Sequence, residues 1–153
     1  MAVKPIPDGY HTATPYLIVR DARRALEFYP RAFGAQETGR FEHDGKIGHA
    51  EIKIGDSPIM LADEYPDRNI LGPESLGGST VGICLYVEDS DAWYERALSA
   101  GCEVLKPIQD QFYGHRSGTV KDPFGHWWTL ASVKEEVTPE ELERRVAAMG
   151  QPG

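Results

Sequence analysis

The segment from Asp110 to Arg116 holds the densest set of chemically active side chains in this sequence. It contains an amide, two aromatic rings, an imidazole and a guanidinium, in the order Gln111, Phe112, Tyr113, His115 and Arg116. Aromatic rings can stack on a flat ligand while polar groups hydrogen-bond to it. A guanidinium can hold a carboxylate or phosphonate through two parallel hydrogen bonds. In the alternative interpretation, Arg116 pairs with a nearby carboxylate and the rings brace an interface. The sequence leaves both open.

His49 and Glu51 are the candidates for acid–base catalysis without a metal. They alternate with apolar residues, so they should share one face of a strand. Either side chain could take a proton from a bound substrate. A site that adds Glu64 to this pair is a further possibility. The five histidines form no H-x-H or H-x-x-x-H pair, and His126, which follows a turn, is expected to have a surface or capping role.

The two cysteines, Cys84 and Cys102, are not spaced as C-x-x-C. This spacing excludes a zinc ribbon and a thioredoxin motif. We expect two free thiols with mainly structural roles.

Length and composition are typical of one compact globular domain. The chain has 153 residues, of which 41% are hydrophobic and 26% charged. Its formal net charge of -8 argues against a nucleic-acid surface, which needs clustered Lys and Arg. No apolar run reaches the roughly 18 residues of a membrane span, and the N-terminus lacks the apolar core of a signal peptide. A cytoplasmic location is therefore expected.

An internal repeat organises the chain. The strand-like segments 16–21 and 84–89 match at an offset of 68 residues, with Leu17 on Leu85 and Asp21 on Asp89. Each is followed by a helical pattern that ends at a glycine. A long period that occurs only twice indicates a duplicated module.

Each module is predicted to contain one strand, one helix and three further strands. In the first module the expected strands are 13–20, 36–43, 46–54 and 58–63. In the second they are 81–87, 102–107, 115–121 and 126–132, with the helix at 90–100. These patterns predict a single domain over 1–153, with module one at about 11–64, a linker at about 65–79, module two at about 80–133 and a C-terminal helix at about 138–150. Thr138 and Glu141 form a predicted capping box for that helix.

Two such modules resemble the glyoxalase/bleomycin-resistance/dioxygenase group of the vicinal oxygen chelate superfamily. The resemblance is carried by ALEFYPRAFGA in module one and KDPFGHWWTLAS in module two, and covers about residues 11–133. The segment DQFYGHRSGTVKDPFGH at 110–126 is similar to the PhnB-like branch. The resemblance implies an α+β fold in which the modules form one curved mixed sheet, with helices on the convex face and a ligand cup on the concave face.

Metal-dependent members of this group carry His, Gln or Glu at four points, on the first and last strands of each module. A divalent ion there acts as a Lewis acid on substrate oxygens. By strand pattern these points correspond here to Thr14, Met60, Gly82 and Thr129. Methionine is too soft for this task, glycine has no side chain and threonine is rarely a ligand alone. The sequence therefore predicts no conventional metal site and no cofactor.

Strand alternation predicts which other side chains line the cup. Tyr16, Met60, Tyr86 and Trp127 should face it, whereas Trp128 should pack under a helix. Together with the aromatic segment, these residues are the predicted ligand contacts. The alternative is that they fill the cup as core residues.

Three functional hypotheses follow. The first is a metal-independent small-molecule binding protein of the bleomycin-resistance or PhnB-like kind. The second is a metal-dependent lyase, isomerase or dioxygenase with displaced metal ligands. The third is a structural or regulatory dimer without a small ligand. A homodimer is expected in any case, because related domains pair through sheet edges or tails and this chain carries an additional helix.

Overall fold

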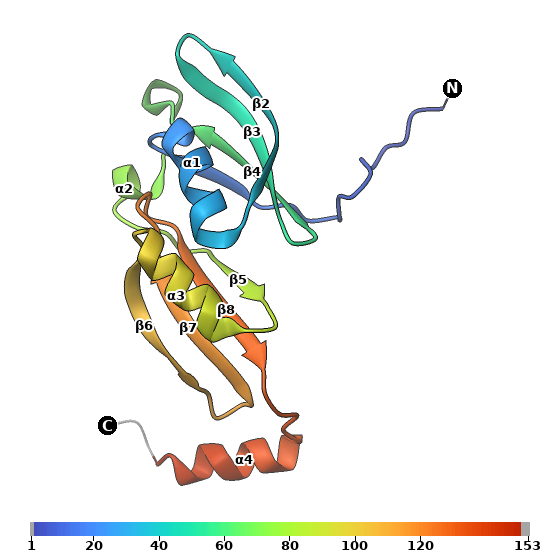
Figure 1. Ribbon diagram of the computed structural model, residues 1–153, viewed down its shortest axis with the longest axis vertical. Helices are drawn as coiled ribbons and strands as arrows, with labels where there is room; N and C mark the ends of the chain where they lie inside the picture. The colour runs from blue at the N-terminus through green and yellow to red at the C-terminus, as the bar shows by residue number, and fades with distance from the viewer. Residues whose placement is uncertain (1, 151–153) are drawn as a thin grey trace.

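The computed structural model describes residues 2–150 and contains two modules with the same order of elements (Figure 1). The first module comprises β1 (Tyr16–Val19), α1 (Ala22–Phe33), β2 (Gln36–His43), β3 (Lys46–Ile54) and β4 (Ser57–Asp63). The second comprises β5 (Gly82–Tyr86), α3 (Ser90–Ala100), β6 (Glu103–Asp110), β7 (His115–Lys121) and β8 (Trp127–Val133). The connecting segment contains the short helices η1 (Pro66–Arg68) and α2 (Pro73–Leu76), and α4 (Pro139–Ala148) follows module two. The predicted α+β class, with two βαβββ modules and a C-terminal helix, is confirmed.

The strands form two four-stranded sheets, in the orders β1-β4-β3-β2 and β5-β8-β7-β6. In each sheet the first and last strands of the module pair in parallel, and the other neighbours are antiparallel. Within residues 2–150 no strand pairing joins the two sheets, so the curved sheet expected from the resemblance is divided in two.

Helices α1 and α3 begin in the same way, and each ends at a glycine. The carboxylates of Asp21 and Asp89 accept a hydrogen bond from a backbone N–H in the first turn of α1 and α3, each at 3.1 Å. Gly34 follows α1 at φ 66°, a left-handed conformation that glycine adopts without steric cost. These caps fix where each chain segment turns from strand to helix and back, and they therefore repeat with the module.

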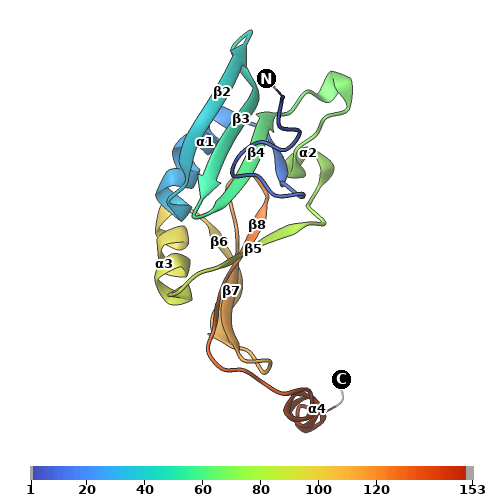
Figure 2. The ribbon, with the colours of Figure 1, turned by 90° about the vertical axis from the view of Figure 1, so that its right-hand side faces the viewer.

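The helices α1 and α3 cover the same side of both sheets (Figure 2). Alternate residues such as Leu17, Val19 and Ile52 are buried beneath α1, and their neighbours lie on the opposite face. Trp128 is fully buried on the helix side, as predicted. The side of each sheet away from the helices is called its open face below.

A buried cluster joins the two modules. Asp122, in the turn between β7 and β8, is 2% exposed and accepts hydrogen bonds from the Tyr29 hydroxyl at 2.6 Å and the Trp128 indole at 2.8 Å. Its other oxygen accepts from the backbone N–H groups of Phe124 and His126 at 2.9 and 3.0 Å. Tyr29 belongs to α1, so this carboxylate ties the first helix to the second sheet. Burial and Asp122 raise the pKa of Tyr29 well above its usual value.

Aromatic rings and a guanidinium complete this junction. The rings of Phe33 and Trp128 lie 4.6 Å apart between centroids. The Arg96 guanidinium, from α3, donates to the carbonyls of Arg31 and Pro30 at 2.8 and 2.9 Å. A cation at the carbonyl end of α1 also interacts favourably with the helix dipole.

The C-terminal helix α4 lies beyond the far end of module two (Figure 1). Thr138 caps it through Glu141 N at 3.2 Å, as predicted, but the Glu141 carboxylate pairs with Arg144 and Arg145 and does not complete the capping box. Arg145 reaches back to the Phe112 carbonyl at 3.0 Å and to Glu135 at 2.6 Å. None of the residues of α4 is buried. No helix among residues 2–150 is long and apolar enough to cross a membrane.

Candidate functional site

The open face of the first sheet carries one row of side chains that crosses four strands. The register places Tyr16 beside Met60, Met60 beside Glu51 and Glu51 beside Gly39. Tyr16 and Met60, both predicted ligand contacts, therefore lie on this face together with Glu51. Tyr16 is 47% exposed, and a Cβ atom built at Gly39 would meet no atom within 4 Å. Open space therefore lies beside Glu51.

Tyr16, His49 and Glu51 form a chain of contacts on this face. The Tyr16 hydroxyl lies 2.8 Å from Nδ1 of His49, and Nε2 of His49 lies 3.4 Å from Oε1 of Glu51. A register shift after Phe41 leaves Gly48 as an extra residue in β3, because Phe41 pairs with His49 while Glu42 pairs with Ile47. The bulge lets Ile47 point into the core and His49 onto the open face.

Glu51 also affects the tyrosines around it. Burial and the Glu51 charge raise the pKa of Tyr16, and burial and a hydrogen bond to Glu51 raise that of Tyr10. Both hydroxyls therefore keep their protons at neutral pH. In this state the Tyr16 hydroxyl can donate a hydrogen bond.

The matching row on the second sheet has a different chemistry. Cys84 lies beside Thr129, Thr129 beside Thr119 and Thr119 beside Lys106. The two threonine hydroxyls are hydrogen-bonded to each other at 2.9 Å. A small cavity of about 160 Å³ lies over them and is lined in part by Gln111 and Tyr113.

Aromatic rings continue this second face. His115 contacts Tyr86 and Tyr113 edge-on, with centroids 5.6 and 5.0 Å apart, and Phe112 packs edge-on against Tyr113. Tyr86 is 65% exposed. It also lines a larger cavity of about 760 Å³, together with Cys84 and with residues 54–57 of module one. The predicted aromatic segment is therefore brought together with Tyr86.

Arg116 lies on the other side of β7. It makes two hydrogen bonds to Asp91 of α3, at 2.8 and 2.9 Å, and one to Asp110 at 3.1 Å. These bonds raise the pKa of Arg116 and lower that of Asp91. This geometry agrees with the interpretation in which Arg116 pairs with a nearby carboxylate. A role of Arg116 in binding a ligand stays a prediction, and these contacts do not favour it.

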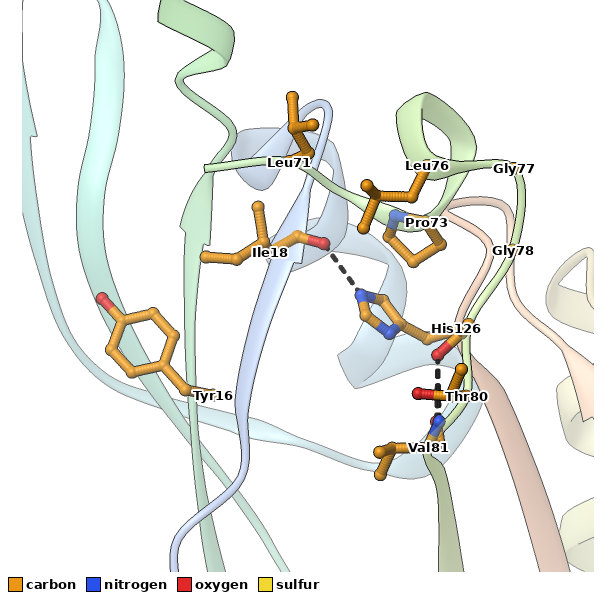
Figure 3. Close-up of a pocket in the computed structure, with 11 residues that line it drawn as sticks. Tyr16, Ile18, Leu71, Pro73, Leu76, Gly77, Gly78, Thr80, Val81 and His126 are labelled. Carbon is orange, nitrogen blue, oxygen red and sulfur yellow. Dashed lines mark hydrogen bonds between the residues drawn. The ribbon is translucent and has the colours of Figure 1, made fainter. Parts of the chain in front are cut away.

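A third cavity, of about 540 Å³, lies between β1 and the connecting segment (Figure 3). Tyr16, Ile18 and Val81 contribute to its lining, and Figure 3 shows His126 pointing toward the Ile18 carbonyl. Nε2 of His126 lies 2.8 Å from that oxygen. His126 is half-buried, and its ring also joins the two modules, which the expected surface or capping role did not include.

Comparisons with known proteins agree with this architecture. A family model described as the Glyoxalase/Bleomycin resistance protein/Dioxygenase superfamily matches residues 10–130. The chain belongs to this superfamily. An uncharacterized protein of Mycobacterium bovis is 42% identical over 141 residues, which are 90% of this chain and 93% of that protein.

Solved structures of other proteins share this fold. TioX from Micromonospora sp. ML1 is 25% identical, with a TM-score of 0.62, and the match covers 84% of this chain and 100% of TioX. A Bacillus cereus protein described as PhnB and as a putative 3-demethylubiquinone-9 3-methyltransferase is 17% identical, with a TM-score of 0.64. That match covers 80% of this chain and 100% of the Bacillus protein, and it shows a common fold only.

The residues at three of the superfamily's four metal-ligand points, Met60, Gly82 and Thr129, do not fit a divalent ion. The Thr129 hydroxyl is bonded to Thr119, and Met60 offers only a soft thioether. At Gly82 the Trp127 ring fills the space of a side chain, since a Cβ atom there would lie 2.2 Å from it. Within residues 2–150, no group of three His, Cys, Asp or Glu side chains is placed to hold a metal ion.

Glu64 does not join His49 and Glu51. Its carboxylate accepts hydrogen bonds from Gly72 N and the Ser75 hydroxyl, both at 2.9 Å, and these bonds lower its pKa. The suggested site of all three residues is therefore wrong, because Glu64 holds the connecting segment.

Sequence reasoning missed several features of these faces. It did not pair Tyr16 with His49, and it did not identify Gly39, Thr119 or Lys106 as parts of the two rows. A glycine inside a strand, such as Gly48, is a signal for a bulge and could have indicated the first site. The thiols of Cys84 and Cys102 are free, as predicted, and burial raises the pKa of Cys102 to about 12.

Proposed function

We propose that this protein binds a small molecule on the open faces of its sheets without a divalent metal, in the manner of a bleomycin-resistance or PhnB-like protein. One observation carries the proposal most directly. Aromatic side chains that a folded domain would normally cover, including Tyr86 and Tyr16, stay exposed on these faces beside cavities large enough for a ligand. The contacts we propose are Tyr16, Met60, Tyr86, Gln111, Phe112, Tyr113, His115 and Trp127.

We propose further that the working form is a homodimer in the cytoplasm. Both open faces lie on the same side of the chain, so they do not enclose a ligand between them (Figure 2). A second copy placed over these faces would close the site and cover the exposed rings. Light scattering should give twice the mass of the chain, and a monomeric mass at micromolar concentration would refute the dimer.

Ligand binding can be tested by thermal shift with a panel of aromatic and anionic compounds. A hit should lose at least about tenfold in affinity on Tyr86→Ala, because a central tyrosine contact is worth more than about 1.4 kcal/mol. Val104→Ala, at an exposed position on the outer strand β6, is the control and should bind normally. Equal affinity in both variants would move the site away from this face.

Elemental analysis of untagged protein distinguishes the alternative function. Near one equivalent of zinc, nickel, manganese or iron would favour a metal-dependent lyase, isomerase or dioxygenase with displaced ligands. Substoichiometric metal throughout would support binding without a metal.

A further inference from the structure

We infer that Tyr16, His49 and Glu51 form a proton-transfer chain, so that the open face of the first sheet has acid–base activity toward a weakly acidic small molecule. The activity goes beyond ligand binding, although it uses the same face. Three side chains from two strands carry it, and none of them is needed to complete the core.

The contacts of His49 with Tyr16 and Glu51 determine the direction of proton transfer. A phenol hydroxyl at 2.8 Å from Nδ1 of His49 can donate its proton there, which leaves the imidazole proton on Nε2. Nε2 then faces the Glu51 carboxylate, which can only accept. Among residues 2–150 no Lys or Arg forms an ion pair with Glu51, so its charge is available to His49.

The raised pKa of Tyr16 agrees with this direction, because the hydroxyl keeps its proton until His49 takes it. The lone pairs of the Tyr16 oxygen remain free to accept a proton from a ligand. The Tyr16 oxygen is therefore the solvent-facing end of the proton-transfer chain.

The proposed step conserves atoms and electrons. The ligand's X–H bond breaks, its electron pair stays on the ligand, and the proton goes to the Tyr16 oxygen. At the same time the Tyr16 O–H bond breaks and that proton binds Nδ1 of His49. The resulting imidazolium faces the Glu51 carboxylate, which stabilises it. The reverse transfer returns a proton to the same atom or to a neighbouring one, so the net reaction is proton exchange or isomerisation and needs no oxidant.

The surroundings indicate the class of substrate. Open space lies beside Glu51 at Gly39, and Met60 of the same row and the exposed Phe41 offer apolar contacts. The Glu51 carboxylate, which has no Lys or Arg ion-pair partner among residues 2–150, would repel an anion. The class that fits is a neutral small molecule with an acidic C–H next to a carbonyl group and an apolar remainder.

The hydrogen bonding of His49 can be measured without a substrate. Long-range ¹H–¹⁵N NMR at about pH 8, where an ordinary histidine is neutral, should show His49 with its proton on Nε2. Tyr16→Phe removes only the hydroxyl, and a mixture of both tautomers should then appear. A proton on Nδ1 in the unchanged protein would overturn the inference.

Activity is tested by deuterium exchange, with hydroxyacetone and phenylacetone as probes in D₂O. The protein should speed exchange of the hydrogens next to the carbonyl, and Tyr16→Phe or His49→Gln should lower that rate by about 100-fold. His43→Gln, at the exposed last residue of β2, is the matched control and should retain the full rate.

The two proposals fail in different ways. Exchange no faster with the protein than with Tyr16→Phe, for both probes, overturns the proton-transfer chain. Ligand binding on Tyr86, measured by thermal shift, can still hold in that case, so the proposed function would survive.

Discussion

The two open faces are built on the same backbone pattern but carry opposite chemistry. Corresponding positions on the two sheets form matching rows, which read Tyr16, Met60, Glu51 and Gly39 on the first sheet and Cys84, Thr129, Thr119 and Lys106 on the second. The first row holds a carboxylate with open space beside it. The second holds paired hydroxyls and a lysine. The strand register of a module therefore determines the positions of the side chains on the open face, but not their chemical types.

The helix sides of the sheets differ from the open faces in another respect. There the two modules share one cluster, in which Asp122 of module two binds Tyr29 of module one. The two modules are thus joined on the side that α1 and α3 cover, and they differ in side-chain chemistry on their open faces.

Disrupting the buried cluster around Asp122 should have the largest effect on stability, because this cluster holds both open faces on the same side. Asp122→Ala removes an acceptor from four donors, two of them on Tyr29 and Trp128. We expect a loss of about 3–5 kcal/mol in the free energy of unfolding, measured by urea denaturation. Asp56→Ala, in the corresponding turn of module one, removes only a contact to Ser57 and should cost less than about 0.5 kcal/mol. Equal losses of stability in the two variants would show that Asp122 contributes no more to folding than Asp56 does.

The glycines of the two faces provide the next test. Gly82→Ala places a methyl group against the Trp127 ring and should cost about 1–3 kcal/mol by overpacking. Gly39→Ala meets open space and should leave the free energy of unfolding within about 0.5 kcal/mol. The same substitution narrows the space beside Glu51, so it should slow exchange of phenylacetone. An unchanged free energy of unfolding in Gly82→Ala would mean that the Trp127 ring can move aside to accommodate the methyl group.

Removing Arg116 should affect the helix side and leave the open face intact. Arg116→Ala should raise the pKa of Asp91 toward its ordinary value, because hydrogen bonds from Arg116 are the main cause of its lowering. A lowered carboxyl pKa stabilises the folded state above that group's ordinary pKa, and the stabilisation is lost as the pH falls through the lowered value. The variant should therefore be slightly less stable than the parent at neutral pH and equal to it in acid, by urea denaturation. A loss of ligand affinity without this change would revive the ligand-binding interpretation of Arg116.

The smallest effect is expected from neutralising Glu51. Glu51→Gln should lower the pKa of Tyr16 only partly, since burial is the larger cause of its rise and the Glu51 charge the smaller. A pH titration of the tyrosine ring signals by NMR measures the change. Glu42→Gln, on the outer strand β2, is the control, and an equal change there would remove the special role of Glu51.

Local patterns in the sequence were sufficient to predict most helices and strands of the fold. Asp21 and Gly34 delimit α1 by chemistry that acts within a few residues, and alternation placed Leu17 and Trp128 on the helix side. The same alternation separates Arg116 from His115, and applying it to β7 would have predicted that Arg116 faces α3.

Contacts between distant segments could not be predicted in the same way. Asp122 and Tyr29 lie 93 residues apart, and nothing in the DPFG turn indicates its partner on α1. The contact between Tyr16 and His49 depends on β4 lying between β1 and β3 and on the bulge at Gly48. The strand order does not follow from residue types alone, and Gly48 suggests a bulge without fixing which residues pair around it.

The position of Asp122 has a consequence for synthesis on the ribosome. Module one emerges first, and Tyr29 and Phe33 then have no Trp128 or Asp122 to pack against. A nascent chain that stops before β7 exposes these rings to chaperones and to other nascent chains. Maturation of the first half must therefore wait for translation of the last quarter of the message, and a truncated product is a natural substrate for degradation.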